Sequence, residues 1–192
     1  MQTAVACAQA LKEWAVTVQA LAEGKQIILL RKGGIREEDR EFRVEQSSFM
    51  LYPTYEHQRA DLLQPPYRPD LDALLATAPP GDRLRFEYWA EVTDVYETLD
   101  AAQVAALTPL HIMTENYAEE RLRWRPKKPL YVVLVRVYRL PAVYLLPYTA
   151  AYGGCKSWVE LERAIPLENM TPVLDDAAYA VKREAVRIAL GR

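Results

Sequence analysis

The chain is poor in cysteine and glycine, and it has no strong excess of charge of either sign. Cys7 and Cys155 are its only cysteines, and they form no C-x-x-C pair, which excludes a common zinc motif and gives no disulfide framework. Thirteen prolines against seven glycines predict stiff loops. The 24 basic and 26 acidic residues leave a net charge of −2, so any attraction for nucleic acid must come from a local patch.

Long apolar runs and catalytic motifs are lacking as well. No segment reaches the roughly 18 apolar residues that a membrane span needs, and the first residues lack the basic stretch of a signal peptide. We find no Asp followed by a strand-borne Glu-x-Lys, the metal-binding set of a nuclease core, and no nucleophile elbow. We therefore expect a cytoplasmic protein with no membrane partner, no metal site and no cofactor.

Helices are predicted where apolar residues recur every three or four positions. This spacing marks residues 4–23, with Lys12 and Glu13 on the polar side and Gly24 as a left-handed cap. Short helices are expected at 71–76, 100–107 and 114–122. A last helix begins near residue 175 and ends at Gly191, and its predicted apolar face consists of Ala178, Val181, Ala185 and Ile188.

Strands outnumber helices in the pattern. Residues 84–92 alternate between apolar and polar, as expected for a sheet with one covered face, and residues 130–140 form the most apolar run. Further strands are predicted at 26–30, 42–45, 48–52 and 143–146. Residues 155–161 alternate as in a strand, which we favour, although residues 157–160 also fit the capping box of a helix. A proline-rich segment at about 60–82 should cover the sheet from outside, because proline lacks the N–H that strand pairing needs. We predict a single α+β domain over residues 1–192, with a mixed or antiparallel curved sheet flanked by N- and C-terminal helices.

The first candidate site surrounds a glycine pair at residues 33–34. Glycine allows positive φ and leaves its N–H groups accessible, and the flanking cations would add charge for an anion. A solvated turn is the alternative interpretation. His57 lies beside Glu56 and could act in acid–base chemistry, although a lone histidine is more often structural. The ligand-binding candidates are Arg31, Lys32, Gly33, Gly34, Arg36, Tyr52 and His57.

The second candidate site is the densest run of cations, and it contains one aromatic residue. A tryptophan among cations suits stacking on a base together with phosphate contacts. The alternative is a solvated helix end, with Glu119 and Glu120 neutralising part of the charge. The nucleic-acid-binding candidates are Arg121, Arg123, Trp124, Arg125, Lys127 and Lys128.

Four sequence blocks carry a resemblance to a family of bacterial proteins. Residues 10–15, 29–35, 51–58 and 154–158 look like a family known only as a domain of unknown function, and the likeness spans nearly the whole chain. Some members of that family occur with a restriction-endonuclease-like domain. The resemblance therefore implies a context in restriction systems, but it implies no catalytic residues.

A weaker resemblance is to the PUA-like group, which includes ASCH domains. It rests on Lys12-Glu13-Trp14, on the turn at Gly24-Lys25, and on Gly81-Asp82 followed by an alternating strand. It implies a small β-barrel with a cleft for RNA or a modified base. An ASCH amidohydrolase pattern has threonine three residues after the lysine, whereas Ile28 follows Lys25 here.

Three hypotheses follow from these patterns. The leading one is a noncatalytic module that binds nucleic acid or a modified base, linked to a restriction system. The second is a small hydrolase acting on a nucleoside-like substrate through Lys25, Glu56 or His57. The third is a protein-interaction module, a homodimer that covers Trp89 and Trp158.

Overall fold

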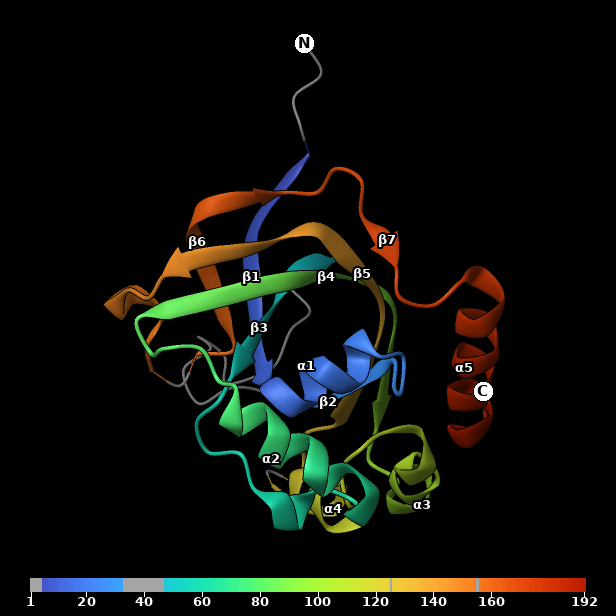
Figure 1. Ribbon diagram of the computed structural model, residues 1–192. Coiled ribbons are helices and arrows are strands. Elements are labelled where there is room, and N and C mark those ends of the chain that lie inside the picture. Colours follow the sequence, from blue (N-terminus) through green and yellow to red (C-terminus); the bar gives the residue numbers. More distant parts are fainter. Residues whose placement is uncertain (1–4, 33–46, 125, 155) are drawn as a thin grey trace.

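A curved mixed sheet with helices against it forms the fold (Figure 1). The computed structural model describes residues 5–32, 47–124, 126–154 and 156–192. The strands are β1 (Ala6–Trp14), β2 (Ile28–Arg31), β3 (Ser48–Thr54), β4 (Arg83–Thr98), β5 (Leu130–Pro147), β6 (Trp158–Pro166) and β7 (Thr171–Pro172). The α-helices are α1 (Ala15–Ala22), α2 (Arg68–Ala76), α3 (Ala101–Ala106), α4 (Glu115–Arg123) and α5 (Asp176–Ala189).

The strand order is β2-β5-β4-β3-β1-β6, with β7 paired to β5. Strands β1 and β3 run parallel, and the other pairings are antiparallel. The prediction of an α+β fold with a mixed curved sheet is therefore confirmed. Among the described residues the sheet stays open, with β2 and β6 as its edges, so the closed barrel implied by the PUA-like resemblance is absent there.

The predicted helix over residues 4–23 is only half right. Residues Ala6–Trp14 form strand β1, and only Ala15–Ala22 form a helix. Strand β1 lies between β3 and β6, and it buries residues on both of its faces. A strand covered on both faces loses the alternation that would identify it. Its small and apolar residues therefore matched a helical spacing equally well.

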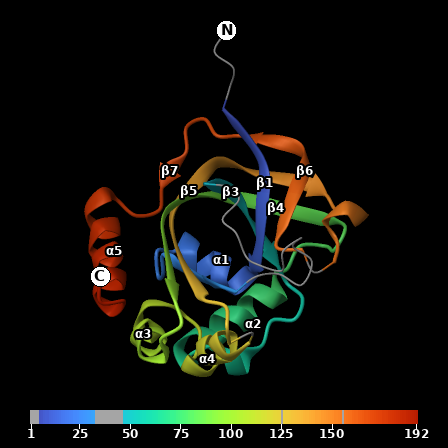
Figure 2. The ribbon, with the colours of Figure 1, turned by 180° about the vertical axis from the view of Figure 1, so that it is seen from behind.

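Strands β4 and β5 form a long antiparallel pair that curves through the molecule, and α3 and α4 lie between them in the chain (Figures 1 and 2). The runs predicted at 130–140 and 143–146 are parts of the single strand β5. Pairing passes from Tyr88 opposite Arg139 to Phe86 opposite Tyr144, so Pro141 lies in an irregular stretch where its missing N–H is tolerated. The strands predicted at 26–30, 48–52 and 155–161 correspond to β2, β3 and β6, whereas 42–45 lies outside the described residues.

Helix α1 lies inside the curve of the sheet, α2, α3 and α4 lie at one end of it, and α5 lies beside it (Figure 2). The proline-rich segment adds no strand to the sheet; it forms short 3-10 turns (Ala60–Leu62 and Pro65–Tyr67) followed by α2. Leu63 and Leu71 from this segment pack against Val16 and Ala20 of α1. Further 3-10 turns occur at Thr108–Leu110 and Ala150–Tyr152.

Helix α5 begins where predicted but presents a different face. The Asp175 side chain accepts a hydrogen bond from the Ala178 N–H at 2.7 Å and so caps the helix. Val181 and Ile188, predicted to face the core, are 71% and 68% exposed, and this part of the prediction is wrong. The buried stripe is instead Tyr179, Val186 and Leu190. Polar anchors contribute to this orientation, because Arg183 forms two 2.7 Å hydrogen bonds with Asp94 of β4.

Candidate functional site

The sequence blocks that carry the family resemblance meet at the C-terminal end of β1. Lys12 lies opposite Tyr52 of β3, and Leu11 lies opposite Trp158 of β6. Glu13 contacts Arg31, the last residue of β2. Adjacent strand residues point to opposite faces, so the side chains of Lys12 and Glu13 have different neighbours.

Glu13 and Arg31 form a buried ion pair. The Arg31 Nη1 donates to the Glu13 Oε2 at 2.9 Å, and the two residues are 9% and 7% exposed. The second carboxylate oxygen of Glu13 accepts the Trp14 N–H at 2.9 Å. Removing one partner of such a pair leaves a buried charge without its counterion, which costs about 3–5 kcal/mol. Arg31 thus joins β2 to β1, and Glu13 does not lie on the exposed polar face predicted for it.

Lys32 performs a similar structural task for helix α4. Its side chain is 4% exposed, and the Nζ donates to the Leu122 carbonyl oxygen in the last turn of α4. Carbonyl groups there have no partner within the helix, and they carry the negative end of its dipole. Burial lowers the pKa of the Lys32 ammonium. Lys32 thus holds the end of α4 through this hydrogen bond. Gly33, Gly34 and Arg36 lie outside the described part of the chain.

Tyr52 and His57 have opposite environments. Tyr52 is 5% exposed, its ring lies 5.5 Å from the Lys12 Nζ, and burial raises the pKa of its phenol to about 12. His57 follows β3 with φ of 60° and a side chain that is 93% exposed. The His57 Nε2 lies 4.0 Å from a carboxylate oxygen of Glu56. The structure does not bring this imidazole into a cluster with Tyr52.

The cationic run lies at the end of α4 and just beyond it. Thr114 caps the start of helix α4, because its hydroxyl accepts the Tyr117 N–H at 3.3 Å. The Arg121 guanidinium lies 4.4 Å from the Tyr117 ring centroid, and Arg123 donates to Glu119 at 2.8 Å. Trp124 is 41% exposed directly after the helix. Lys127 is exposed and Lys128 is half-buried, whereas Arg125 lies outside the described residues.

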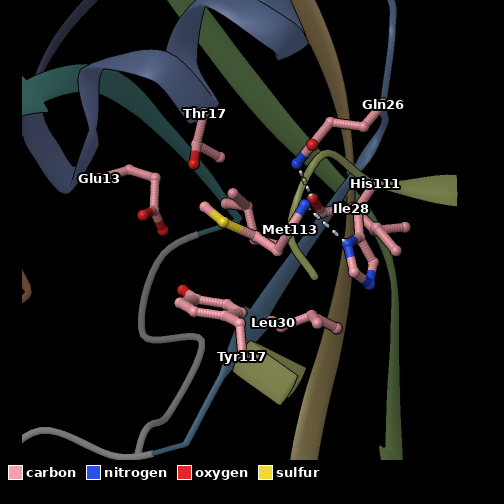
Figure 3. Close-up of a pocket in the computed structure, with 9 residues that line it drawn as sticks. Glu13, Thr17, Gln26, Ile28, Leu30, His111, Met113 and Tyr117 are labelled. Carbon is pink, nitrogen blue, oxygen red and sulfur yellow. Dashed lines mark hydrogen bonds between the residues drawn. The ribbon is translucent and has the colours of Figure 1, made fainter. Parts of the chain in front are cut away.

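A small cavity with polar and apolar lining lies between β1, β2, α1 and α4 (Figure 3). Glu13, Thr17 and Tyr117 line one side, and Gln26, His111 and Met113 line the other. The Gln26 Oε1 accepts the Ile112 N–H at 3.0 Å. The His111 Nδ1 accepts the Met113 N–H at 3.1 Å, which assigns the ring hydrogen to Nε2. Burial lowers the pKa of His111 to about 4, so this ring is neutral near pH 7.

The sequence patterns did not single out Thr17, His111 or Tyr117 as site residues. Glu13 did carry a signal, because it belongs to the first block of the family resemblance. The signal was hidden because residues 6–14 matched a helix. No three of the described His, Cys, Asp or Glu side chains are grouped closely enough to hold a metal ion. None of the helices in the described part of the chain is long and apolar enough to cross a membrane.

The fold and this site define an α+β protein whose open mixed sheet encloses a buried ion pair beneath a cationic helix end. Residues 10–185 match the family described as Domain of unknown function (DUF1802), and the chain belongs to that family. No curated protein matches the chain. No solved structure matches it either.

Proposed function

We propose that the chain is a noncatalytic module of the cytoplasm that binds single-stranded nucleic acid at the end of helix α4. The observation that carries this proposal is the partly exposed indole of Trp124, which follows Arg121 and Arg123 and precedes Lys127. An indole offers a face on which any base can stack, and the cations can contact the neighbouring phosphates. We also propose that the bound base can be a modified one and that the module acts beside a nuclease in a restriction system.

The balance of charges favours single strands over duplexes as the ligand. With a net charge of −2, the protein does not attract polyanions as a whole. Part of the local positive charge is also neutralised, since Arg123 pairs with Glu119. Stacking contributes about 1–3 kcal/mol per base and needs a base that is not paired. A single strand can therefore use both the indole and the cations, whereas a duplex can use only the cations.

Contacts below the surface support the proposal by holding the end of α4 in place. Lys32 binds the Leu122 carbonyl oxygen, and the Tyr117 ring lies under the Arg121 guanidinium. Tyr117 itself is 7% exposed and lines the cavity beside Glu13. Ordering a flexible side chain on binding costs about 0.5–1.5 kcal/mol. A surface that is already anchored avoids part of that cost.

Fluorescence anisotropy with labelled single- and double-stranded DNA and RNA, over a series of salt concentrations, tests the proposal. We expect single strands to bind more tightly than duplexes of the same length. Trp124→Ala should weaken single-strand binding by about 1–3 kcal/mol with little change in salt dependence. Arg123→Ala, alone and combined with Lys127→Ala, should instead reduce the log–log salt slope by roughly 0.7 for each phosphate that the protein no longer neutralises.

Arg187→Ala is the matched control, because Arg187 also lies on a helix surface and pairs with a glutamate, Glu184, at 3.2 Å. This variant removes the same charge from helix α5 and should bind as the wild type does. The proposal is contradicted if no oligonucleotide binds at low salt. It is equally contradicted if Arg187→Ala weakens binding as much as Arg123→Ala.

The two alternative hypotheses have less support in the described residues. The hydrolase hypothesis rested on Lys25, Glu56 or His57, yet the Lys25 Nζ lies 2.7 Å from both Glu23 and Asp70. The side chains of Glu56 and His57 are 90% and 93% exposed. A homodimer over Trp89 and Trp158 would have to cover rings that already pack in the core. The Trp89 and Tyr138 ring centroids lie 5.3 Å apart, and those of Trp158 and Phe49 lie 5.1 Å apart.

A further inference from the structure

The buried hydroxyl of Thr17 faces the cavity between β1, β2, α1 and α4. Thr17, on helix α1, is 3% exposed, and its Oγ1 has no hydrogen-bond partner in the described part of the chain. Figure 3 shows that this oxygen, the Glu13 carboxylate and the Tyr117 hydroxyl point into the same space. The cavity leaves about 10 Å³ for the centre of a water molecule. A space of roughly 10–15 Å³ by this measure holds one water.

We propose that this cavity is a binding site for one ordered water molecule, which bridges the Thr17 hydroxyl, the Glu13 carboxylate and the Tyr117 hydroxyl. A buried water typically makes about three hydrogen bonds to buried polar groups, and these three side chains supply that number. The inference concerns the interior of the fold and does not depend on the proposed function.

The donors and acceptors around the cavity suit water. The Glu13 carboxylate only accepts, and its Oε2 already receives the Arg31 Nη1 at 2.9 Å, which leaves further lone pairs available. Burial raises the pKa of the Tyr117 phenol to about 12, so the phenol keeps its proton and can donate. The Thr17 hydroxyl can both donate and accept. A water that donates to Glu13 and accepts from Tyr117 keeps one hydrogen for Thr17.

Size excludes larger ligands. A cavity that admits the centre of one water-sized sphere has no room for a phosphate, a nucleoside or a metabolite. The guanidinium of Arg31 beside Glu13 also disfavours a cation, because it already supplies the positive charge that the carboxylate needs. The water would connect β1, α1 and α4 through Glu13, Thr17 and Tyr117.

The test combines a high-resolution crystal structure with thermal unfolding of variants. Thr17→Val keeps the shape of the side chain but removes its hydroxyl, so the sign of its effect separates a satisfied hydroxyl from an unsatisfied one. If water satisfies the hydroxyl, Thr17→Val should lower Tm by about 2–4 °C. Thr108→Val is the control, because the Thr108 Oγ1 is also buried with no partner among the described residues but does not line this cavity. It should leave Tm unchanged or raise it.

The wild-type crystal should show one water within hydrogen-bond distance of the Thr17 Oγ1, and the Thr17→Val crystal should lack that bond. Tyr117→Phe should lower Tm less in the Thr17→Val background than in the wild type, because both changes act on one water. A dry cavity in the wild-type crystal overturns the proposal. A Thr17→Val protein that melts at or above the wild-type Tm overturns it as well.

Discussion

At the scale of single residues, side chains with the chemistry of binding groups are used inside this molecule. Arg31, Lys32 and Tyr52 are each less than 10% exposed, although all three were candidates for ligand binding from their residue types. Each has an internal partner: the Glu13 carboxylate, the Leu122 carbonyl oxygen and the Lys12 ammonium, respectively. The contrast with the exposed His57 shows that burial, more than residue type, separates structural groups from available ones.

His111 makes the acid stability of the protein predictable. Its pKa lies at about 4 in the folded protein, below the ordinary value of 6.5, because burial disfavours the charged ring. The unfolded chain therefore binds this proton at a higher pH than the folded chain does, and protonation favours unfolding. Stability should be retained above about pH 6.5 and lost as the pH falls toward 4. At about 1.4 kcal/mol for each pH unit between these values, the loss approaches about 3 kcal/mol.

Urea unfolding at a series of pH values measures this effect. His111→Asn keeps an acceptor for the Met113 N–H but does not titrate, so its stability should change much less between pH 6.5 and 4. His57→Asn is the control, since that side chain is 93% exposed and asparagine tolerates its positive φ. A His111→Asn protein with an undiminished loss of stability in this window would contradict the assignment.

At the scale of elements, the prediction was accurate at four helix caps and less so inside β1 and α5. The caps at Gly24, Asp100, Thr114 and Asp175 lie where the sequence placed helix boundaries. Caps depend on side chains within a few residues, so the local sequence is sufficient to find them. The strand character of β1 depends on pairing with β3 and β6, which are distant in sequence.

Gly24 follows the end of α1 and also packs closely against Leu174. A comparison of Gly24 with Gly191 can separate the effect of positive φ from the effect of packing. Gly24 and Gly191 both have positive φ, 65° and 67°. A Cβ on Gly24 would lie 2.6 Å from the Leu174 Cδ2, whereas a Cβ on Gly191 would meet nothing within 4 Å. Positive φ costs an alanine about 1–2 kcal/mol at either position. We expect Gly191→Ala to lower the free energy of unfolding by about this amount.

Gly24→Ala should be clearly more destabilising, because the Leu174 side chain must also move. Chemical denaturation of the two variants in parallel provides the measurement. Adding Leu174→Ala to Gly24→Ala should recover the steric part of the destabilisation, after allowing for the effect of Leu174→Ala alone. Equal destabilisation by Gly24→Ala and Gly191→Ala would show that the approach to Leu174 has no energetic consequence.

At the scale of the whole molecule, the antiparallel β4–β5 pair connects separate parts of the core. Strand β5 supplies Leu140 and Leu146 to one buried cluster, Val133 and Val135 to a second, and Leu134 to a third. Loss of this strand therefore exposes all three clusters together. The single domain over residues 1–192 stays a prediction, and this arrangement supplies its physical reason.

We expect thermal unfolding to be one cooperative transition. The tryptophans report on different places: Trp89 packs on the first cluster, Trp158 on the second, and Trp14 on the cluster below α1. Tryptophan fluorescence and far-UV circular dichroism should therefore give the same midpoint. Leu134→Ala, at a site that is 0% exposed, should destabilise by about 2–5 kcal/mol and shift both midpoints equally. Two separated transitions would contradict a single domain.

By itself, the sequence determined the α+β class, most strand positions, the helix caps and the family. These properties rest on local spacing and on capping residues, which neighbours in the chain are enough to specify. The tertiary structure alone decided that residues 6–14 form a strand, which face of α5 is buried, and that Arg31 pairs with Glu13. It also brought Thr17, Glu13 and Tyr117 to one cavity. Each of these depends on contacts between segments far apart in the chain, and burial and charge pairing there outweigh local propensity.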